Sequence, residues 1–300
     1  MTGFDEGKAA ETQPPAVKVL VISLSDAEDR RAIMRARLDP LGLDYAFVEG
    51  VDGRRFDVLA HPAYDSPRRR RGFGRDMTGG ELGCLLSHRK VMEIMVAERL
   101  DPVLVLEDDA VLAPDLMAVL HALLACPVPY DAVRLIGSPK LARLTQRRVW
   151  PLAPGYWLNR LETTPGGAYA YLLRRSGAEK LLPYLQRNWL PVDALMGRAW
   201  DHGLDWFIVQ PGVTDYDRAV GSHIGETRFD KTLQLTAAER LTYPLTRAGQ
   251  KLSETFGKRR VYWATRAADR RWRRQAEKQG GAAPPARVRT DSARVRTDSE

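Results

Sequence analysis

The chain has 300 residues, of which 44% are hydrophobic and 28% are charged, and its formal net charge at pH 7 is +8. This length and apolar content are sufficient for one large domain with appended segments. The sequence has no apolar run of 18 residues and only two cysteines, Cys84 and Cys126. Composition therefore excludes a predicted transmembrane helix and a disulfide framework.

Residues 1–15 are polar, include acidic side chains and contain no hydrophobic segment. We therefore expect a flexible N-terminus rather than a secretory signal, and a cytoplasmic protein. The apolar pattern after this segment predicts a strand over 17–22, a helix over 26–38 and a second strand over 43–48. These elements open the main domain, which we predict over residues 16–250.

A basic run, SPRRRRGFGR, occupies residues 66–75. Arginines flanked by proline and glycine are typical of a mobile loop. Such a loop offers cations to the phosphates of a ligand, and a solvated charged loop without a ligand explains the same pattern. The sequence leaves both interpretations open.

A long helix is predicted over residues 80–98, because leucine, valine, isoleucine and methionine recur there at helical spacing. Thr78 and Glu81 have the spacing of a capping box at its start. Four consecutive polar residues interrupt the apolar stripe, namely Ser87, His88, Arg89 and Lys90. His88 is either a structural histidine of the helix packing or part of a pocket that this helix shares with the next strand.

The next strand, Val103 to Glu107, is a continuous apolar run that leads into three consecutive carboxylates, Glu107, Asp108 and Asp109. A short run of this kind is typical of a strand buried on both faces of an α/β sheet, and such sheets bind ligands at the carboxyl ends of their strands. Adjacent carboxylates repel one another unless a cation lies among them. The cluster indicates either a divalent cation that carries a substrate pyrophosphate or a solvated acidic turn.

The pattern after the acidic cluster continues the alternation of helices and strands. The expected elements are a helix over 116–124, a strand over 132–136, a strand over 168–173, a helix over 176–184 and a strand over 206–209. Alternation of this kind predicts the α/β class, with a mixed, largely parallel sheet and helices on both faces.

Residues 251–300 carry 14 Lys and Arg against 6 Asp and Glu, so the whole charge surplus lies in this part of the chain. Within it, residues 251–279 are predicted to form a basic amphipathic helical segment that includes Trp263 and Trp272. A helix of this type lies on anionic membranes, which allows a peripheral position on the inner face of the plasma membrane. A helix that covers part of the core is the second interpretation, and nucleic-acid binding is the third.

Residues 280–300 contain the heptad ARVRTDS twice in tandem, after a linker rich in glycine, alanine and proline. Two copies of a short polar repeat cannot bury a core. We therefore predict a disordered tail and assign it no function.

Three segments of the chain resemble glycosyltransferase family 25, which includes bacterial lipooligosaccharide galactosyltransferases and collagen galactosyltransferase domains. They are VKVLVISLSDAEDRRAIMRARLDPLGLDYAFVEGVDG at 17–53, GGELGCLLSHRKVMEIMV with PVLVLEDDAVL at 79–112, and GGAYAYLLRRSGAEKLLPYL with PVD at 166–193. The resemblance covers roughly residues 17–215. The chain departs from the family at Ser23, where the family usually has asparagine.

The resemblance implies a GT-A-type nucleotide-sugar-binding domain. It implies inverting transfer of a sugar, galactose from UDP-galactose in the first instance, onto a glycan acceptor such as the core of lipooligosaccharide or lipopolysaccharide. The implied cofactor is Mn²⁺ or Mg²⁺, with Asp109, Asp108 and His223 as the metal ligands. The residues that it places near the donor are Ser23, Leu24, Arg30, Arg31, Ser87, His88, Lys90, Glu107 and Asp108.

Inversion in a single displacement requires a general base that takes the proton of the acceptor hydroxyl. The resemblance places Asp193 in that role, with Asp201 and Asp205 as rivals. A helix N-cap is the structural alternative for Asp193. Asp193 and Asp109 are thus the expected catalytic residues.

Two other function classes remain open. A metal-dependent nucleotide-sugar or phosphoester hydrolase would use the same acidic strand end, although the sequence lacks a second dense cluster of metal ligands. A non-catalytic protein that binds a glycan or a membrane would keep the fold and the basic tail. The intact acidic triplet and the Ser-His segment argue against this last class.

Overall fold

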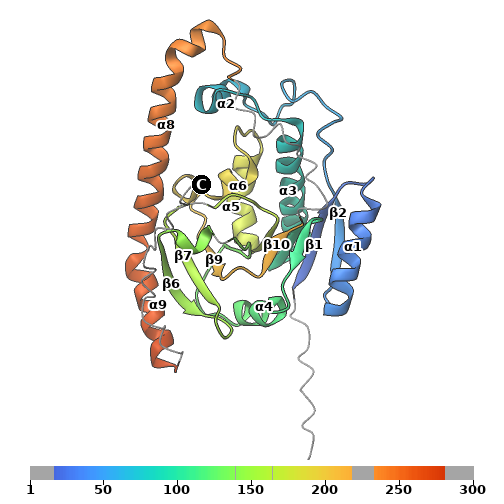
Figure 1. Ribbon diagram of the computed structural model, residues 1–300, viewed down its shortest axis with the longest axis vertical. Coiled ribbons are helices and arrows are strands. Elements are labelled where there is room, and N and C mark those ends of the chain that lie inside the picture. The colour runs from blue at the N-terminus through green and yellow to red at the C-terminus, as the bar shows by residue number, and fades with distance from the viewer. Residues whose placement is uncertain (1–16, 139, 164, 218–232, 281–300) are drawn as a thin grey trace, which may run out of the picture.

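A single eight-stranded sheet organises the chain in the computed structural model (Figure 1), which describes residues 17–138, 140–163, 165–217 and 233–280. The strands follow the order β2-β1-β3-β8-β5-β9-β7-β6 across the sheet. Their bounds are β1 Lys18–Ser23, β2 Tyr45–Glu49, β3 Val103–Glu107, β5 Ala132–Arg134, β6 Gln146–Pro151, β7 Trp157–Leu161, β8 Ala170–Leu173 and β9 Trp206–Gln210. A separate two-stranded sheet pairs β4 Ala110–Leu112 with β10 Thr214–Tyr216.

The large sheet is mixed. Three of its pairings are parallel, β1 with β2, β1 with β3 and β5 with β9, and the other four are antiparallel. Only β8 and β7 run against the common direction, so six of the eight strands point the same way. The predicted α/β class with a mixed, largely parallel sheet is confirmed.

Helices lie on both faces of this sheet. The connection from β1 through α1 to β2 runs one way along the sheet, and the connection from β2 through α3 to β3 runs the other way, so right-handed crossovers place α1 and α3 on opposite faces (Figure 1). Helix α5 packs against α3. The helices of the sheet region are α1 Glu28–Leu38, α3 Gly79–Ala97, α4 Leu116–Leu124, α5 Arg175–Leu185, α6 Val192–Met196 and α7 Ala199–His202, with short 3-10 turns η1 Asp39–Leu41 and η2 Leu141–Arg143.

The core is built on the central strands. Residues Val103 to Leu106 of β3 are completely buried, as are all four residues of the adjacent strand β8. This burial on both faces is what the continuous apolar run of β3 predicts. Parallel pairing of β1 with β3 places Ile22 opposite Glu107, so both strands end at the same edge of the sheet. The acidic triplet therefore begins where β1 also ends.

Every strand and helix predicted between residues 17 and 210 is present, and its ends differ by at most two residues from the expected ones, whereas the helical segment predicted over 251–279 begins earlier, at Ala237. The hairpin formed by β6 and β7 was not predicted. Strand β6 has the sequence QRRVWP, in which only Val149 is fully buried, so it lacks the alternating apolar pattern of a half-buried strand. Pairing with β7, rather than its own composition, makes it a strand.

The prediction of a mobile loop at residues 66–75 is wrong, because most of this run forms helix α2, Ser66–Phe73. Asp65 caps the helix by accepting the N–H of Arg68, and Gly74 ends it in the left-handed conformation at φ 73°. Three arginines of the run, Arg69, Arg70 and Arg75, form ion pairs with acidic residues that follow in the sequence. Arg70 pairs with Asp76 at 2.7 Å, and helix α2 packs against α8.

Two helices form the C-terminal part of the described chain, α8 Ala237–Ala264 and α9 Arg266–Lys278. Helix α8 starts at a capping box of Thr236 and Glu239 and continues without a break past residue 250. Asp269 of α9 is buried against β6 and β7, where its carboxylate accepts hydrogen bonds from Arg147 at 3.1 Å and Arg160 at 2.9 Å. The basic segment is therefore helical, and part of it covers the core.

None of the helices in the described ranges is both long and apolar enough to span a bilayer. The predicted flexible N-terminus, residues 1–15, and the repeat-containing segment after residue 280 lie outside the described residues.

Candidate active site

A cleft of about 540 Å³ lies at the edge of the sheet where β1 and β3 end. Its walls come from these two strand ends, from the turn at residues 50–54 and from the N-terminal half of α3. Eight of the predicted site residues line it, namely Ser23, Leu24, Arg30, Ser87, His88, Glu107, Asp108 and Asp109. The structure thus brings together most of the residues that were expected to contact the donor.

The three carboxylates of the cleft differ in their surroundings. Asp108 is buried and forms an ion pair with Arg30 at 2.9 Å. Asp109 has no such partner among the described residues, and its Oδ1 is buried without a hydrogen bond. Burial, together with the charges of Glu107 and Asp108, raises the pKa of Asp109 to about 7.

An orphaned, buried carboxylate oxygen beside two further carboxylates fits a hard divalent cation. Such a cation would supply the missing partner of Asp109 and reverse the rise in its pKa. Asp108 accepts a hydrogen bond from Arg30 at one oxygen, which fixes the orientation of this carboxylate. Asp109 and Asp108 are therefore the residues that could hold Mn²⁺ or Mg²⁺, whereas the third expected ligand, His223, lies outside the described residues.

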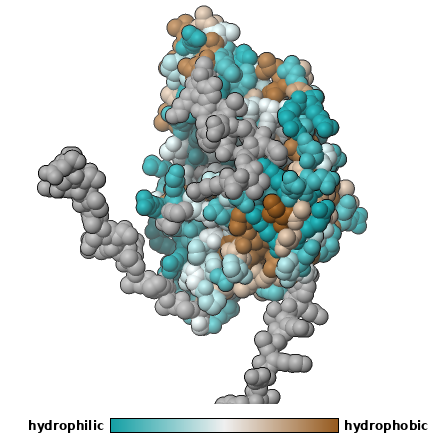
Figure 2. All heavy atoms as spheres, turned by 45° about the vertical axis from the view of Figure 1, so that its right-hand side comes forward, coloured by the Kyte–Doolittle hydropathy of each residue, from teal (hydrophilic) through white to brown (hydrophobic). Residues whose placement is uncertain are grey.

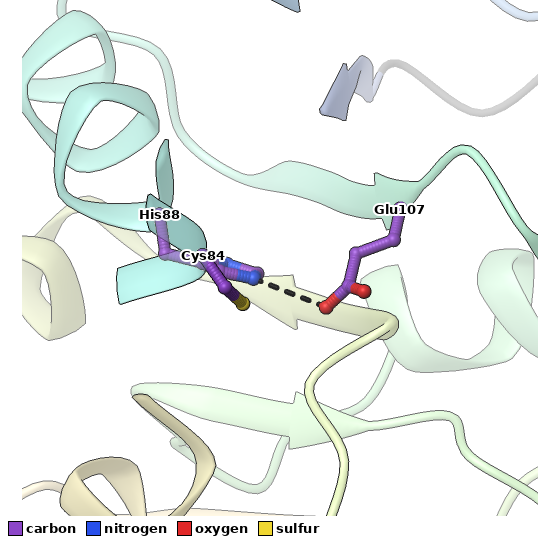
Figure 3. Close-up of side chains that lie close together, drawn as sticks. All are labelled: Cys84, His88 and Glu107. Carbon is purple, nitrogen blue, oxygen red and sulfur yellow. Dashed lines mark hydrogen bonds and ion pairs between the residues drawn. The ribbon is translucent and has the colours of Figure 1, made fainter. Parts of the chain in front are cut away.

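His88 is completely buried and connects α3 to the acidic strand. Its Nδ1 lies 2.8 Å from the Tyr171 hydroxyl and its Nε2 lies 3.2 Å from Glu107 Oε1 (Figure 3). In the tautomer that carries its hydrogen on Nε2, His88 donates to the Glu107 carboxylate and the Tyr171 hydroxyl donates to Nδ1. With both ring nitrogens engaged, His88 positions Glu107 at the cleft.

Cys84 lies one helical turn before His88, and its sulfur faces the same point (Figure 3). The ligand atoms of Cys84, His88 and Glu107 lie within 4.8 Å of one another, which is close enough to consider a metal site. Burial raises the pKa of the Cys84 thiol well above its usual range, so the thiol is protonated, and His88 has no free nitrogen. The oxygen atoms of Asp108 and Asp109 are the better donor set for a cation that also binds phosphate.

Two residues that were predicted to lie near the nucleotide-sugar donor, Arg31 and Lys90, support the cleft from outside its surface. Arg31 donates to the Ser23 hydroxyl at 3.3 Å and to the Ser23 carbonyl at 3.2 Å. Lys90 donates to the Glu49 carbonyl at 3.0 Å. Neither Arg31 nor Lys90 lines the cleft, so both hold the backbone of the strand ends rather than reaching the ligand space.

The turn that follows β2 forms one wall of the cleft and was not among the predicted site residues. A Cβ atom at Gly53 would lie 1.9 Å from the carbonyl oxygen of Gly79 at the start of α3, so only glycine permits this approach. Ser87 joins the same two segments, since its hydroxyl accepts the Val51 N–H at 2.8 Å and donates to the Gly83 carbonyl. The turn sequence was visible in the chain, but its contact with α3 is tertiary.

Asp193 lies in the first turn of α6 and does not line the cleft. Its carboxylate accepts the N–H groups of Gly167 and Ala194 at 2.8 Å and 2.7 Å. Pro191, not Asp193, is the N-cap of this helix. Asp193 is close enough to Cys84 in the cleft wall for its charge to contribute to the raised pKa of the thiol.

The two rival bases are held by arginines. Asp201 pairs with Arg198, and Asp205 pairs with Arg160 at 2.8 Å. Among the described residues, the Asp193 carboxylate pairs with no Lys or Arg. Of the three candidates, Asp193 is thus the one that keeps its carboxylate out of an ion pair.

The family model described as "Glycosyltransferase family 25 (LPS biosynthesis protein)" matches residues 16–196. A glycosyltransferase 25 family member of Aedes aegypti is 33% identical over 55% of this chain and 27% of its own length. An inactive glycosyltransferase 25 family member 3 of Homo sapiens is 33% identical over 66% of this chain and 32% of its own length. Procollagen galactosyltransferase 1-B of Xenopus laevis is 27% identical over 61% and 31%, respectively.

The chain spans about a third of the length of the curated relatives that it matches. Two solved structures of low similarity also align with the chain. A glycosyltransferase involved in glycosylation of the major capsid of PBCV-1 aligns with a TM-score of 0.37 at 9% identity, over 69% of this chain and 98% of its own. The inositol-1-phosphate CTP transferase of T. maritima aligns with a TM-score of 0.34 at 9% identity, over 79% and 98%.

Proposed function

Because the chain belongs to glycosyltransferase family 25, we propose that it transfers a sugar from a nucleotide donor to a hydroxyl group of a glycan. The donor is UDP-galactose, and the acceptor is the core of lipooligosaccharide or lipopolysaccharide. The proposed catalytic domain, residues 16–250, has a GT-A-type arrangement with the donor in the cleft at the ends of β1 and β3; α8 continues past residue 250, and α9 packs against β6 of this domain.

One observation carries this proposal, the buried and unpartnered Oδ1 of Asp109 beside Asp108. A nucleoside diphosphate leaves as a polyanion, and Asp109 and Asp108 would hold a divalent cation whose charge would stabilise that leaving group. Arg30 orients Asp108 through their ion pair. His88 and Tyr171 hold Glu107 at the cleft, where its free oxygen is available to hydroxyl groups of the donor.

The acceptor hydroxyl must lose its proton as it attacks the donor sugar, and Asp193 is the proposed base. Its carboxylate is fixed by two backbone N–H groups. Arg134 fixes the backbone around it by donating to the carbonyls of Gly167 and Asp193, at 2.9 Å each. A carboxylate held in this way keeps its geometry while it accepts a proton, which general-base catalysis requires.

Two alternatives use the same site. A hydrolase would transfer the sugar or phosphate to water, and a non-catalytic protein would bind a glycan or membrane without turnover. The second alternative has weight because the human relative is named inactive. The paired state of Asp108 and the unpartnered state of Asp109 favour a working cation site over a degenerate one.

The proposed location is the cytoplasm, with peripheral attachment to the inner face of the plasma membrane. The C-terminal helices hold the net positive charge of the chain, and an anionic leaflet attracts such a surface. A lipid-linked acceptor would then be exposed on the same surface as the enzyme.

A panel of radiolabelled nucleotide sugars tests the proposal, with Mn²⁺, with Mg²⁺ and with a chelator. Transfer of label from UDP-galactose to a lipopolysaccharide-core acceptor, and loss of transfer with the chelator, supports it. Release of free sugar at the same rate with and without acceptor identifies a hydrolase. Binding of UDP-galactose without transfer or release identifies a non-catalytic protein.

A further inference from the structure

Helix α8 presents large hydrophobic side chains to solvent along much of its length. Five of them are strongly exposed, Leu241 at 83%, Leu245 at 78%, Leu252 at 71%, Phe256 at 77% and Trp263 at 54%. Hydrophobic residues also appear at the top of Figure 2, at the height where Figure 1 shows the N-terminal end of α8. Single exposed hydrophobic residues are ordinary, but five on one helix are not.

These five residues form one line along the helix, which we call the apolar stripe. They are separated by four, seven, four and seven residues. At about 100° per residue these intervals keep all five within an arc of roughly 60°. The stripe extends over 22 residues, or about 33 Å at 1.5 Å per residue. The remaining strongly exposed hydrophobic residues of the described chain, Ile33, Leu59, Tyr184, Tyr216 and Leu233, are spread over separate segments.

The opposite face of α8 is fixed to the protein. Thr246 and Arg247 donate to the carbonyls of Arg71 and Gly72 at the end of α2, at 2.8 Å each. Tyr262 is buried, and its carbonyl accepts a hydrogen bond from Arg147 of β6. The stripe is therefore held outward on a helix that is already formed, so docking requires no further ordering of the backbone.

The charge around the stripe identifies what covers it. Helices α8 and α9 together carry twelve Lys and Arg against four Asp and Glu, which equals the +8 of the whole chain. Arg240, Lys251 and Arg260 of α8 are exposed, and Arg266 lies over the ring of Trp263 at 4.9 Å. A second copy would bring two such positive surfaces together, and a nucleic acid offers no partner for leucine side chains. An anionic lipid surface meets both the apolar residues and the charges.

We propose that the apolar stripe of α8 docks onto an anionic phospholipid surface, with the flanking arginines and lysines at the headgroups. This refines the membrane contact proposed above, because it assigns the contact to the outward face of α8 between residues 241 and 263. Part of the predicted basic segment is instead used within the protein, since Asp269 and Tyr262 are buried. The contact does not depend on transferase activity.

Vesicle co-sedimentation of the full chain tests the proposal, without nucleotide sugar or acceptor. The probes are vesicles of equimolar phosphatidylglycerol and phosphatidylcholine, and vesicles of phosphatidylcholine alone. The stripe variant is Leu245→Ser with Leu252→Ser. The matched control is Ile33→Ser with Leu59→Ser, which removes two exposed hydrophobic residues outside α8. Thermal unfolding followed by circular dichroism shows whether each variant is folded.

The wild type should bind the anionic vesicles far better than the neutral ones, and added salt should weaken that binding. The stripe variant should bind at least roughly tenfold more weakly, given the free energy of burying a leucine side chain, and the control should bind like the wild type. Equal binding of the stripe variant and the wild type would overturn the proposal. The proposal would also be overturned if the wild type did not bind the vesicles and instead formed a dimer through the stripe or bound a single-stranded oligonucleotide.

Discussion

Arg30 and Asp108 form an ion pair of 2.9 Å in which both side chains are nearly buried, with exposed fractions of 11% and 8%. The pair joins α1 to the end of β3, across 78 residues of sequence. It neutralises one carboxylate of an acidic triplet and leaves Asp109 as the carboxylate with an unpartnered buried oxygen. The three carboxylates, which look equivalent in the sequence, therefore differ in their partners: Asp108 has Arg30, Glu107 has His88, and Asp109 Oδ1 has none among the described residues.

Asp109→Asn should stabilise the protein at neutral and alkaline pH in the absence of metal. The pKa of Asp109 rises from 3.8 to about 7 on folding, so between these values the unfolded state releases a proton that the folded state retains. The contribution of Asp109 to the free energy of unfolding is therefore fully present below pH 4. It is lost as the pH rises toward 7, by an amount on the order of 4 kcal/mol. Urea unfolding from pH 4 to pH 8 should show this slope in the wild type and not in Asp109→Asn.

Mn²⁺ should raise the melting temperature of the wild type at pH 8 and leave that of Asp109→Asn unchanged, because a ligand that binds only the folded state stabilises it. The exposed Glu98→Gln change is the control for both measurements and should behave like the wild type. A pH slope or a Mn²⁺ response that persists in Asp109→Asn would contradict the assignment of Asp109 as metal ligand. Sugar transfer should be abolished in Asp109→Asn.

Asp193→Asn should lower kcat by roughly 10²–10⁴-fold and leave the KM for the donor unchanged, since a general base acts on the acceptor proton. Asp201→Asn and Asp205→Asn are the matched controls, because their carboxylates are paired with arginines. Steady-state kinetics with saturating acceptor distinguish the three. A loss confined to donor KM in Asp193→Asn, with kcat intact, would remove Asp193 from the role of base.

Asp269→Asn should destabilise the protein by roughly 3–5 kcal/mol, because it leaves the charges of Arg147 and Arg160 without their buried partner. Glu277→Gln, which breaks an exposed ion pair with Arg273 on the same helix, should cost at most about 0.5 kcal/mol. Urea unfolding at pH 7 measures both. Equal effects of the two substitutions would mean that α9 does not contribute to the stability of the domain.

Gly53→Ala should destabilise the fold and weaken donor binding together, since the added Cβ would lie 1.9 Å from the Gly79 carbonyl oxygen and push α3 away from the turn. Gly249→Ala is the contrasting change. A Cβ at Gly249 meets nothing within 4 Å, so alanine should stabilise α8 by about 0.5–1 kcal/mol. Thermal unfolding of both variants, with nucleotide titration of Gly53→Ala, checks these directions. A Gly53→Ala protein as stable as the wild type would show that the close contact is relaxed.

The sequence by itself determined the elements whose signal is local. The apolar run before Glu107 specifies β3, and the apolar residues at helical spacing between 80 and 98 specify α3, because burial of these apolar side chains dominates the stability of both elements. The resemblance through the acidic strand and the Ser-His segment identified the family, and most donor residues that it implied do line one cleft.

Tertiary structure decided what depends on partners distant in the sequence. Most of the arginine run at 66–75 is a helix, and it is held by contacts that no local pattern predicts: Arg70 pairs with Asp76, and α8 packs against α2. His88 is identified as a positioning residue only by the hydrogen bond between its Nδ1 and the hydroxyl of Tyr171, which lies 83 residues away in the sequence. The two C-terminal helices likewise have different roles, since Asp269 of α9 is buried and the leucines of α8 are exposed to solvent. A linear sequence shows charge and hydrophobicity, but only packing shows which side chains remain free to act.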